Sequence, residues 1–128
     1  MLKLASDPKN VAVVESFVGN ICREYKIQKE IYGNILISLT EAVNNAIIHG
    51  NKNDESKTVR IHLDKMPDRI AFRVSDEGRG FDANNLPDPT CPQNITKCGG
   101  RGVFLMRQLC DRIDFHDNGR TVEMHFIL

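Results

Sequence analysis

The chain has 128 residues, of which 41% are hydrophobic and 27% are charged. At this length we expect one domain over residues 1–128, able to bury roughly two thirds of its unfolded surface. Seventeen basic and seventeen acidic residues cancel, which excludes a strong overall field that would attract nucleic acid or an anionic membrane. No apolar run could span a bilayer, and the start MLKLASDPKN lacks the apolar block of a signal peptide. A cytoplasmic protein is therefore expected.

The four cysteines indicate reduced thiols rather than a structural zinc site. None forms a C-x-x-C pair, and no histidine lies at zinc-finger spacing. Cys22 and Cys110 fall in apolar helical segments, which predicts small core residues. Cys91 and Cys98 fall in a loop, where either a plain thiol or a redox role fits the sequence.

The first half of the chain predicts one strand and two helices. Residues 1–5 alternate weakly between apolar and polar, as in a short strand. Ser6-Asp7-Pro8 is typical of a helix start, and apolar residues then recur at helical spacing until about Tyr25. A second helix is predicted from about Lys29 to His49, with Gly50 as a left-handed C-terminal cap.

The second half predicts two hairpins. Four stretches alternate apolar and polar residues: 59–63, 70–74, 113–115 and 122–126. Met66-Pro67-Asp68 joins the first pair, and Asn118-Gly119 predicts a two-residue hairpin turn for the second. His62 and His125 fall on the polar side, where solvent contact is expected. One apolar face on each strand favours an α/β two-layer sandwich, a mostly antiparallel mixed sheet with helices on one face.

The second predicted helix carries an unusual polar row. Residues four apart on a helix lie above one another, which stacks Glu41, Asn45 and His49. Asn34 and Ser38 continue the row a turn or two earlier. Short polar side chains hold fixed positions, so the row predicts a binding surface, although an ordinary solvated face fits the helix alone equally well. His49 either contacts a bound anion or only caps the helix.

Two glycine-rich segments accompany that helix. Asp76 opens DEGRGFD at the end of a predicted strand, where Gly78 and Gly80 would let a flat ligand approach the backbone. Asp76 can accept a hydrogen bond from an exocyclic amine there, but a glycine-rich turn capped by an aspartate is the competing interpretation. Further on, Gly99 to Gly102 (GGRG) leads into an apolar helical pattern. Free N–H groups at a helix N-terminus favour an anion such as phosphate, and Arg101 could add a charged contact.

Together, in this order and spacing, the three segments resemble the three boxes of the GHKL ATPases, whose nucleotide site is the Bergerat fold. The matching residues are Glu41 to Asn45, Asp76 to Gly80, and Gly100 to Gly102. Thr121 stands where that family usually has an adenine-site threonine. EAVNNAIIHGN and DEGRGFD look most like the anti-sigma factor serine/threonine kinases. The lid segment, with Pro87, Pro89 and Pro92, departs more from that family's pattern.

The resemblance implies a protein kinase that uses ATP and Mg²⁺. Such a protein holds a sigma factor and phosphorylates an anti-anti-sigma (STAS-type) partner, is a homodimer, and contacts neither nucleic acid nor membrane. Glu41 would be the general base, Asn45 the Mg²⁺ ligand and Arg101 a γ-phosphate contact. Residues 83–98 would form the ATP lid. The adenine and phosphate contacts would come from Asp76, Gly78, Gly80, Gly100, Gly102, Val103 and Thr121.

Three other functions compete with this one. A non-catalytic ATP-binding anti-sigma switch would have the same binding residues, but it would have little use for the Glu41 carboxylate. The ATPase domain of a histidine kinase would work with a phosphoacceptor histidine on a separate helix pair, and none of the four histidines lies in such a segment. A nucleic-acid-binding module is disfavoured by the zero net charge and the few aromatic residues.

Overall fold

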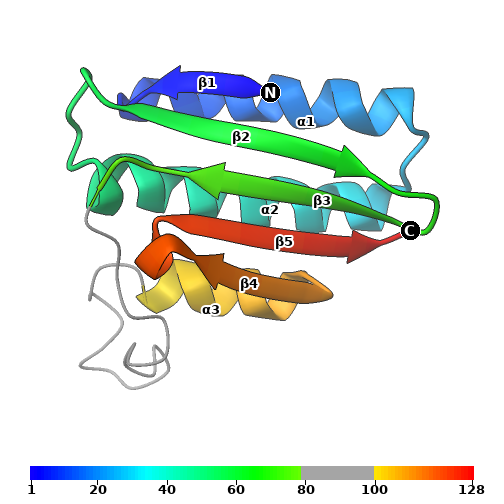
Figure 1. Ribbon diagram of the computed structural model, residues 1–128. Helices are drawn as coiled ribbons and strands as arrows, with labels where there is room; N and C mark the ends of the chain where they lie inside the picture. Colours follow the sequence, from blue (N-terminus) through cyan, green and yellow to red (C-terminus); the bar gives the residue numbers. More distant parts are fainter. Residues whose placement is uncertain (79–99) are drawn as a thin grey trace.

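A computed structural model describes residues 1–78 and 100–128 of the chain (Figure 1). Five strands form one sheet in the order β1-β2-β3-β5-β4. Their bounds are Leu2–Ala5 (β1), Thr58–Lys65 (β2), Arg69–Ser75 (β3), Arg112–His116 (β4) and Thr121–Ile127 (β5). All four pairings in this part of the chain are antiparallel, so the sheet is purely antiparallel where a mixed one was expected.

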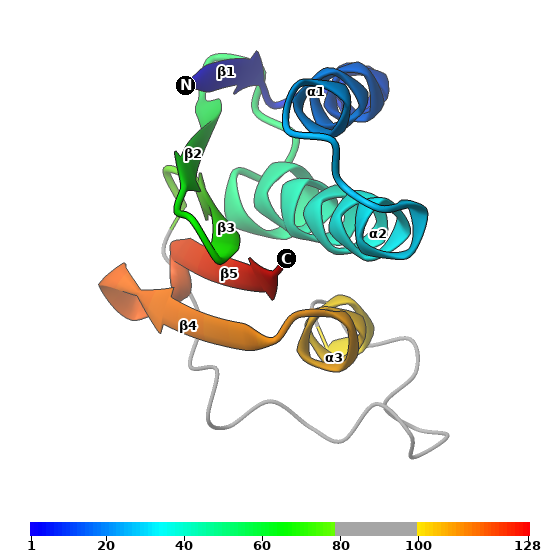
Figure 2. The ribbon, with the colours of Figure 1, turned by 90° about the vertical axis from the view of Figure 1, so that its right-hand side faces the viewer.

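Three α-helices lie side by side on one face of the sheet (Figure 2). They are Val11–Glu24 (α1), Lys29–Asn45 (α2) and Gly100–Leu109 (α3). A short 3₁₀ turn, Pro8–Asn10, precedes α1, and the Asp7 carboxylate caps it by accepting from the Lys9 N–H at 3.0 Å. No described element covers the other sheet face. The predicted two-layer α/β sandwich with helices on one face is confirmed.

The core lies between the helices and the inward face of the sheet. Alternate residues of β3 and β5 are buried there, and Phe72 is fully enclosed. Its ring packs edge-on against Phe17 of α1 and Phe126 of β5, with centroids 6.5 and 6.2 Å apart. Cys22 and Cys110 belong to this core as free thiols, as predicted. Burial raises the pKa of Cys110 to about 11, which keeps this thiol protonated and unreactive.

The end of the second helix differs from the prediction. The α-helix stops at Asn45, and residues Ala46–Gly50 form a π-helical turn in which the Asn51 N–H donates to the Ala46 carbonyl at 2.8 Å. Gly50 was predicted to be a left-handed cap, and this was wrong: among the described glycines only Gly119 has a positive φ. The C-cap residue is Asn51, with φ −89°. The reason for a glycine at position 50 lies in its neighbours, described below.

The second hairpin turn is also longer than predicted. His116 pairs with Thr121, so four residues rather than two connect β4 to β5. Asp117, Asn118 and Gly119 all have positive φ, and the Arg120 N–H donates back to the Asp117 carbonyl at 3.2 Å. The Asn-Gly pair does take the left-handed conformation that predicted a turn here.

None of the helices in the described part of the chain combines the length and hydropathy that a bilayer crossing needs.

Candidate functional site

Three parts of the fold meet at one end of the molecule. The C-terminal ends of α2 and β3 and the N-terminal end of α3 all lie on the left side of Figure 1. These are the places where the sequence predicted the polar row, the aspartate and the anion-binding helix start. The topology therefore brings the three predicted segments to one edge of the sandwich, with α3 packed along α2.

Asp76 follows β3 directly and turns its carboxylate toward the helix layer. Its N–H donates to the Arg120 carbonyl at 2.9 Å, which continues the β3–β5 pairing by one residue. Its Oδ1 accepts from the Gly78 N–H at 2.7 Å. A Cβ built at Gly50 would lie only 2.5 Å from Asp76 Cγ, closer than real atoms approach. Gly50 is thus a glycine because the aspartate packs directly on its backbone.

Gly78 closes the same contact from the other side. A Cβ at this position would overlap the Gly50 carbonyl oxygen and lie 2.6 Å from the Gly50 carbonyl carbon. The π-turn after α2 and the turn after β3 therefore touch backbone to backbone, with the Asp76 carboxylate enclosed between them. The sequence predicted that Gly78 lets a ligand approach the backbone; the structure shows instead that it lets the Gly50 backbone approach, a contact the sequence did not reveal.

We expect Gly78→Ala to lower the free energy of unfolding by about 1–3 kcal/mol, because the atoms it would strike are backbone and cannot move aside. Gly33→Ala is the matched control: nothing lies within 4 Å of its Cβ position in α2. This change should stabilise the protein by about 0.5–1 kcal/mol, since alanine is the better helix former. Urea unfolding of both variants measures the contrast, and equal stability of Gly78→Ala and the parent would contradict the packing.

The electrostatics of Asp76 are those of a carboxylate withdrawn from water. Partial burial raises the pKa of Asp76, and the Gly78 N–H together with the more distant Arg120 and Lys57 charges only partly offsets this rise. Among the described residues no cation forms an ion pair with Asp76, so its partial burial is energetically unfavourable for the charged form. Such groups cluster at functional sites, where a ligand supplies the missing donor.

Glu41 and Asn45 lie one turn apart on α2, and both are partly exposed. Asn45 is the last residue of the helix, immediately before the π-turn that brings Gly50 to Asp76. The row does not extend backwards as predicted, because Ser38 is completely buried in the core. His49, at the other end, is exposed. The polar row is therefore short and lies beside the Asp76 turn.

The start of α3 supplies the third component. The backbone is helical from Gly100, so the N–H groups of its first turn have no partner within the helix. Val103, predicted to offer its N–H to phosphate, is 3% exposed and anchors this turn in the core. The side chain of Arg101 lies outside the described part of the structure. So do Gly80, Cys91, Cys98 and the predicted lid over residues 83–98.

Thr121 lies elsewhere. Its hydroxyl donates to Asp117 Oδ2 at 3.3 Å and shares a hydrogen bond of 3.0 Å with Ser75 Oγ. These groups line a hollow on the open sheet face, together with His62 and Arg73. Because side chains alternate along a strand, the face that presents Thr121 is opposite the one toward which Asp76 turns. The structure does not bring the two predicted adenine contacts together.

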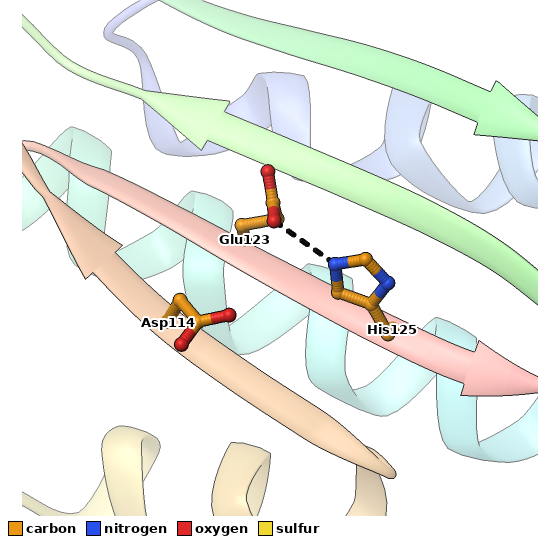
Figure 3. A group of neighbouring side chains, drawn as sticks. All are labelled: Asp114, Glu123 and His125. Carbon is orange, nitrogen blue, oxygen red and sulfur yellow. Dashed lines mark hydrogen bonds and ion pairs between the residues drawn. The ribbon is translucent and has the colours of Figure 1, made fainter.

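The open face also carries a polar cluster of Asp114, Glu123 and His125 (Figure 3). His125 was predicted to be solvated, and this was wrong: its side chain is 13% exposed, and Nε2 contacts Glu123 Oε2 at 2.9 Å. Ligand atoms of the three residues lie within 4.8 Å of one another. Arg73 already pairs with Glu123 at 3.2 Å, and Arg112 pairs with Asp114 at 2.8 Å. These arginines neutralise the carboxylates that a cation would require.

The hydrogen bond from His125 and the charges of His125 and Arg73 lower the pKa of Glu123 despite some desolvation. A carboxyl whose pKa is lowered in the folded state stabilises the fold above its unfolded pKa, about 4.3, and loses this effect as pH falls. We therefore expect Glu123→Gln to lower the free energy of unfolding by about 0.2–1 kcal/mol at pH 7. Urea unfolding should show this difference shrinking below pH 4. A constant difference down to pH 3 would contradict the ion-pair origin.

The fold thus combines a sheet covered by helices on one face, a half-buried aspartate after the central strand β3, and a glycine-rich start of α3. The chain belongs to the histidine kinase-like ATPase domain family, whose model matches residues 4–126. It is 25% identical over 130 residues to the serine-protein kinase RsbW of Listeria innocua, covering 96% of this chain and 83% of that protein. It is 28% identical to the serine-protein kinase RsbW of Bacillus cereus strain Q1, covering 96% and 81% respectively. The predicted membership of this ATPase family is confirmed.

Proposed function

We propose that the protein is an ATP-dependent serine/threonine protein kinase of the anti-sigma factor type. The observation that carries this proposal is the Asp76 carboxylate, held half-buried between Gly50 and Gly78. The C-terminal end of α2, whose last turn includes Glu41 and Asn45, and the α3 N-terminus lie at the same end of the fold. The relatives named serine-protein kinase support the reaction type.

Base recognition is assigned to Asp76. Its carboxylate accepts a hydrogen bond from the adenine amino group, which replaces the water lost on partial burial. Guanine presents a carbonyl oxygen at the same position, and two acceptors facing each other would leave a buried polar mismatch of about 1–3 kcal/mol. Gly78 shapes this site by letting the turn after β3 pack against the Gly50 backbone. Because Thr121 faces the opposite side of the sheet, we assign it no direct contact with the base.

Phosphate binding is assigned to the two helix ends. The free N–H groups at Gly100 and Gly102, and the N–H of Val103, point along the α3 axis toward the phosphates, and Arg101 contacts the γ-phosphate. Asn45 is partly exposed, and its carboxamide oxygen is the kind of hard ligand that Mg²⁺ prefers. The ion, when bound, neutralises charge on the phosphate oxygens.

The proposed reaction is transfer of the γ-phosphoryl group to a serine or threonine hydroxyl of the partner protein. Glu41 takes the hydroxyl proton as the oxygen forms a bond to the γ-phosphorus. The bond between that phosphorus and the β,γ-bridging oxygen breaks, and ADP leaves with the electron pair. The family resemblance assigns the role of ATP lid to residues 83–98, which lie outside the described part of the chain.

The remaining assignments follow from the family. The substrate is an anti-anti-sigma (STAS-type) protein, the sequestered partner is a sigma factor, and the kinase acts as a homodimer in the cytoplasm. A purely binding role as an ATP-dependent anti-sigma switch uses the same binding residues, and it differs only in whether phosphate is transferred.

The test is a transfer assay with Mg²⁺ and γ-labelled ATP, with and without a candidate anti-anti-sigma protein. Label on the partner, but not on a version whose acceptor serine is alanine, supports the kinase. A parallel titration compares ATP with GTP. ATP binding without label on any partner favours the switch, and equal affinity for ATP and GTP would remove the role given to Asp76.

A further inference from the structure

We propose that Asn51 is a positioning residue that fixes the Asp76–Gly78 turn for recognition of the base; this rests on the proposed function. Asn51 directly follows the π-turn and is 1% exposed, which is rare for a carboxamide. Its Oδ1 accepts from the Glu77 N–H at 2.7 Å. Its Nδ2 donates to Ser6 Oγ at 2.7 Å and to the Thr58 carbonyl at 3.2 Å.

These contacts require a group that both accepts and donates. A carboxamide does so at its two ends, whereas an aspartate lacks the donors and a leucine lacks both. A buried carboxamide is tolerated only when its hydrogen bonds are made, and here both ends are satisfied. Ser6 Oγ in turn donates to the Lys57 carbonyl at 2.8 Å, so the network ends on the backbone just before β2.

The partner of Oδ1 is the peptide between the adenine-site residues. Glu77 lies between Asp76 and Gly78 in the chain, and the Asp76 carboxylate accepts a hydrogen bond from the Gly78 N–H. The sheet holds Asp76 on one side through its bond to Arg120. Asn51 holds the next peptide on the other side. With both peptides fixed, the Asp76 carboxylate has a defined direction, which selective hydrogen bonding to a base demands.

The π-turn explains how Asn51 reaches this place. Two consecutive residues, Gly50 and Asn51, contact the two consecutive residues Asp76 and Glu77. The same turn begins directly after Asn45. Asn51 therefore sets the spacing between Asn45, assigned to the phosphate side at the end of α2, and the Asp76 carboxylate, assigned to the base.

The experiment compares Asn51→Leu with the matched control Ser6→Ala. The leucine variant removes the bond to Glu77, whereas Ser6→Ala breaks the same buried network but keeps that bond. Amide hydrogen exchange reports the Glu77 N–H, and titration with ATP and GTP reports base preference. We expect Asn51→Leu to speed exchange of Glu77 about tenfold and to lower the ATP-over-GTP preference about tenfold. Ser6→Ala should lose stability but change neither quantity.

Unchanged Glu77 exchange in Asn51→Leu would overturn the anchoring, and faster exchange with unchanged base preference would overturn its role in recognition. If Asn51→Leu does not fold, Asn51→Ala removes the same bonds and is measured in its place. Equal loss of base preference in Ser6→Ala would show a merely structural effect. Failure of the parent protein to bind ATP would contradict the proposed function, while the exchange measurement would still decide whether Asn51 anchors the turn.

Discussion

Glu41→Gln is expected to reduce phosphoryl transfer to the partner protein by about 10²–10⁴-fold, the range for loss of a general base. Glutamine has the shape of glutamate but cannot take the hydroxyl proton. Glu41 lies one turn before Asn45 on the rigid α2, so the change leaves the helix and the base-binding turn in place. ATP affinity should stay within a few-fold of the parent value. Single-turnover transfer of γ-label measures the first quantity, and calorimetric titration measures the second.

The matched control is Glu30→Gln, an exposed glutamate in the first turn of the same helix. It removes the same charge from α2 far from the Asp76 turn and should transfer label at the parent rate. Parent-like transfer by Glu41→Gln would exclude Glu41 as the base. Loss of both transfer and ATP binding in this variant would indicate instead that the carboxylate helps to hold the nucleotide.

Asp76→Asn is expected to weaken ATP binding about 10- to 100-fold, which corresponds to the loss of one charge-assisted hydrogen bond. An asparagine can still accept from Gly78, so the turn itself is retained. GTP binding should weaken less than ATP binding, since the carboxylate that repels the guanine carbonyl has been removed. Asp64→Asn, an exposed change on β2, is the charge-matched control and should leave both affinities unchanged.

The same variant should be no less stable than the parent at pH 7. Burial raises the pKa of Asp76 in the folded protein, so ionisation of this group favours the unfolded chain. Its contribution to stability is complete below the unfolded pKa of about 3.9 and is lost as pH rises through the folded pKa. Replacing the carboxylate removes this unfavourable term at neutral pH. Urea midpoints should thus be equal or higher for Asp76→Asn at pH 7, and this advantage should disappear near pH 3.

A clear fall in stability at pH 7 would show that the carboxylate supports the fold rather than the ligand. The combination expected here, weaker binding with undiminished stability, is typical of a residue retained for function at some expense to the fold. This combination distinguishes Asp76 from Gly78, because substitution of Gly78 should reduce both ATP binding and stability.

Much of the fold followed from local patterns. Alternation in residues 59–63 and 122–126 predicted strands with one buried face, and the periodicity over about 29–49 predicted a helix on that face, four residues longer than the α-helix observed. These patterns report which side of an element is buried, and so they predicted the sandwich. They also placed Asp76 at a strand end and Gly100 at a helix start, which is why those residues meet at one edge.

The pattern could not predict contacts that depend on the partner element. The row from Glu41 to Asn45 was visible, but Ser38 is polar and still completely buried, on a helix that packs against α3. Gly50 resembled a helix cap, and only the approach of Asp76 reveals why it lacks a side chain. His125 alternates with the buried Met124 and Phe126 and was therefore expected to face solvent, yet its side chain is only 13% exposed and contacts Glu123. Thr121 matched the family's adenine-site threonine by its position in the chain. Strand alternation, however, directs its hydroxyl to the open face of the sheet, opposite Asp76.

The π-turn over Ala46–Gly50 has a consequence for how this segment can change over evolution. Removing one residue would restore ordinary helical winding and rotate everything after it by about 100°, carrying Gly50 and Asn51 away from the turn after β3. Within the turn, exposed side chains such as that of Ile48 can vary freely. Insertions and deletions should therefore be excluded between Asn45 and Asn51 but accepted among the exposed residues 52–56. Length, more than composition, is the conserved property to look for in related sequences.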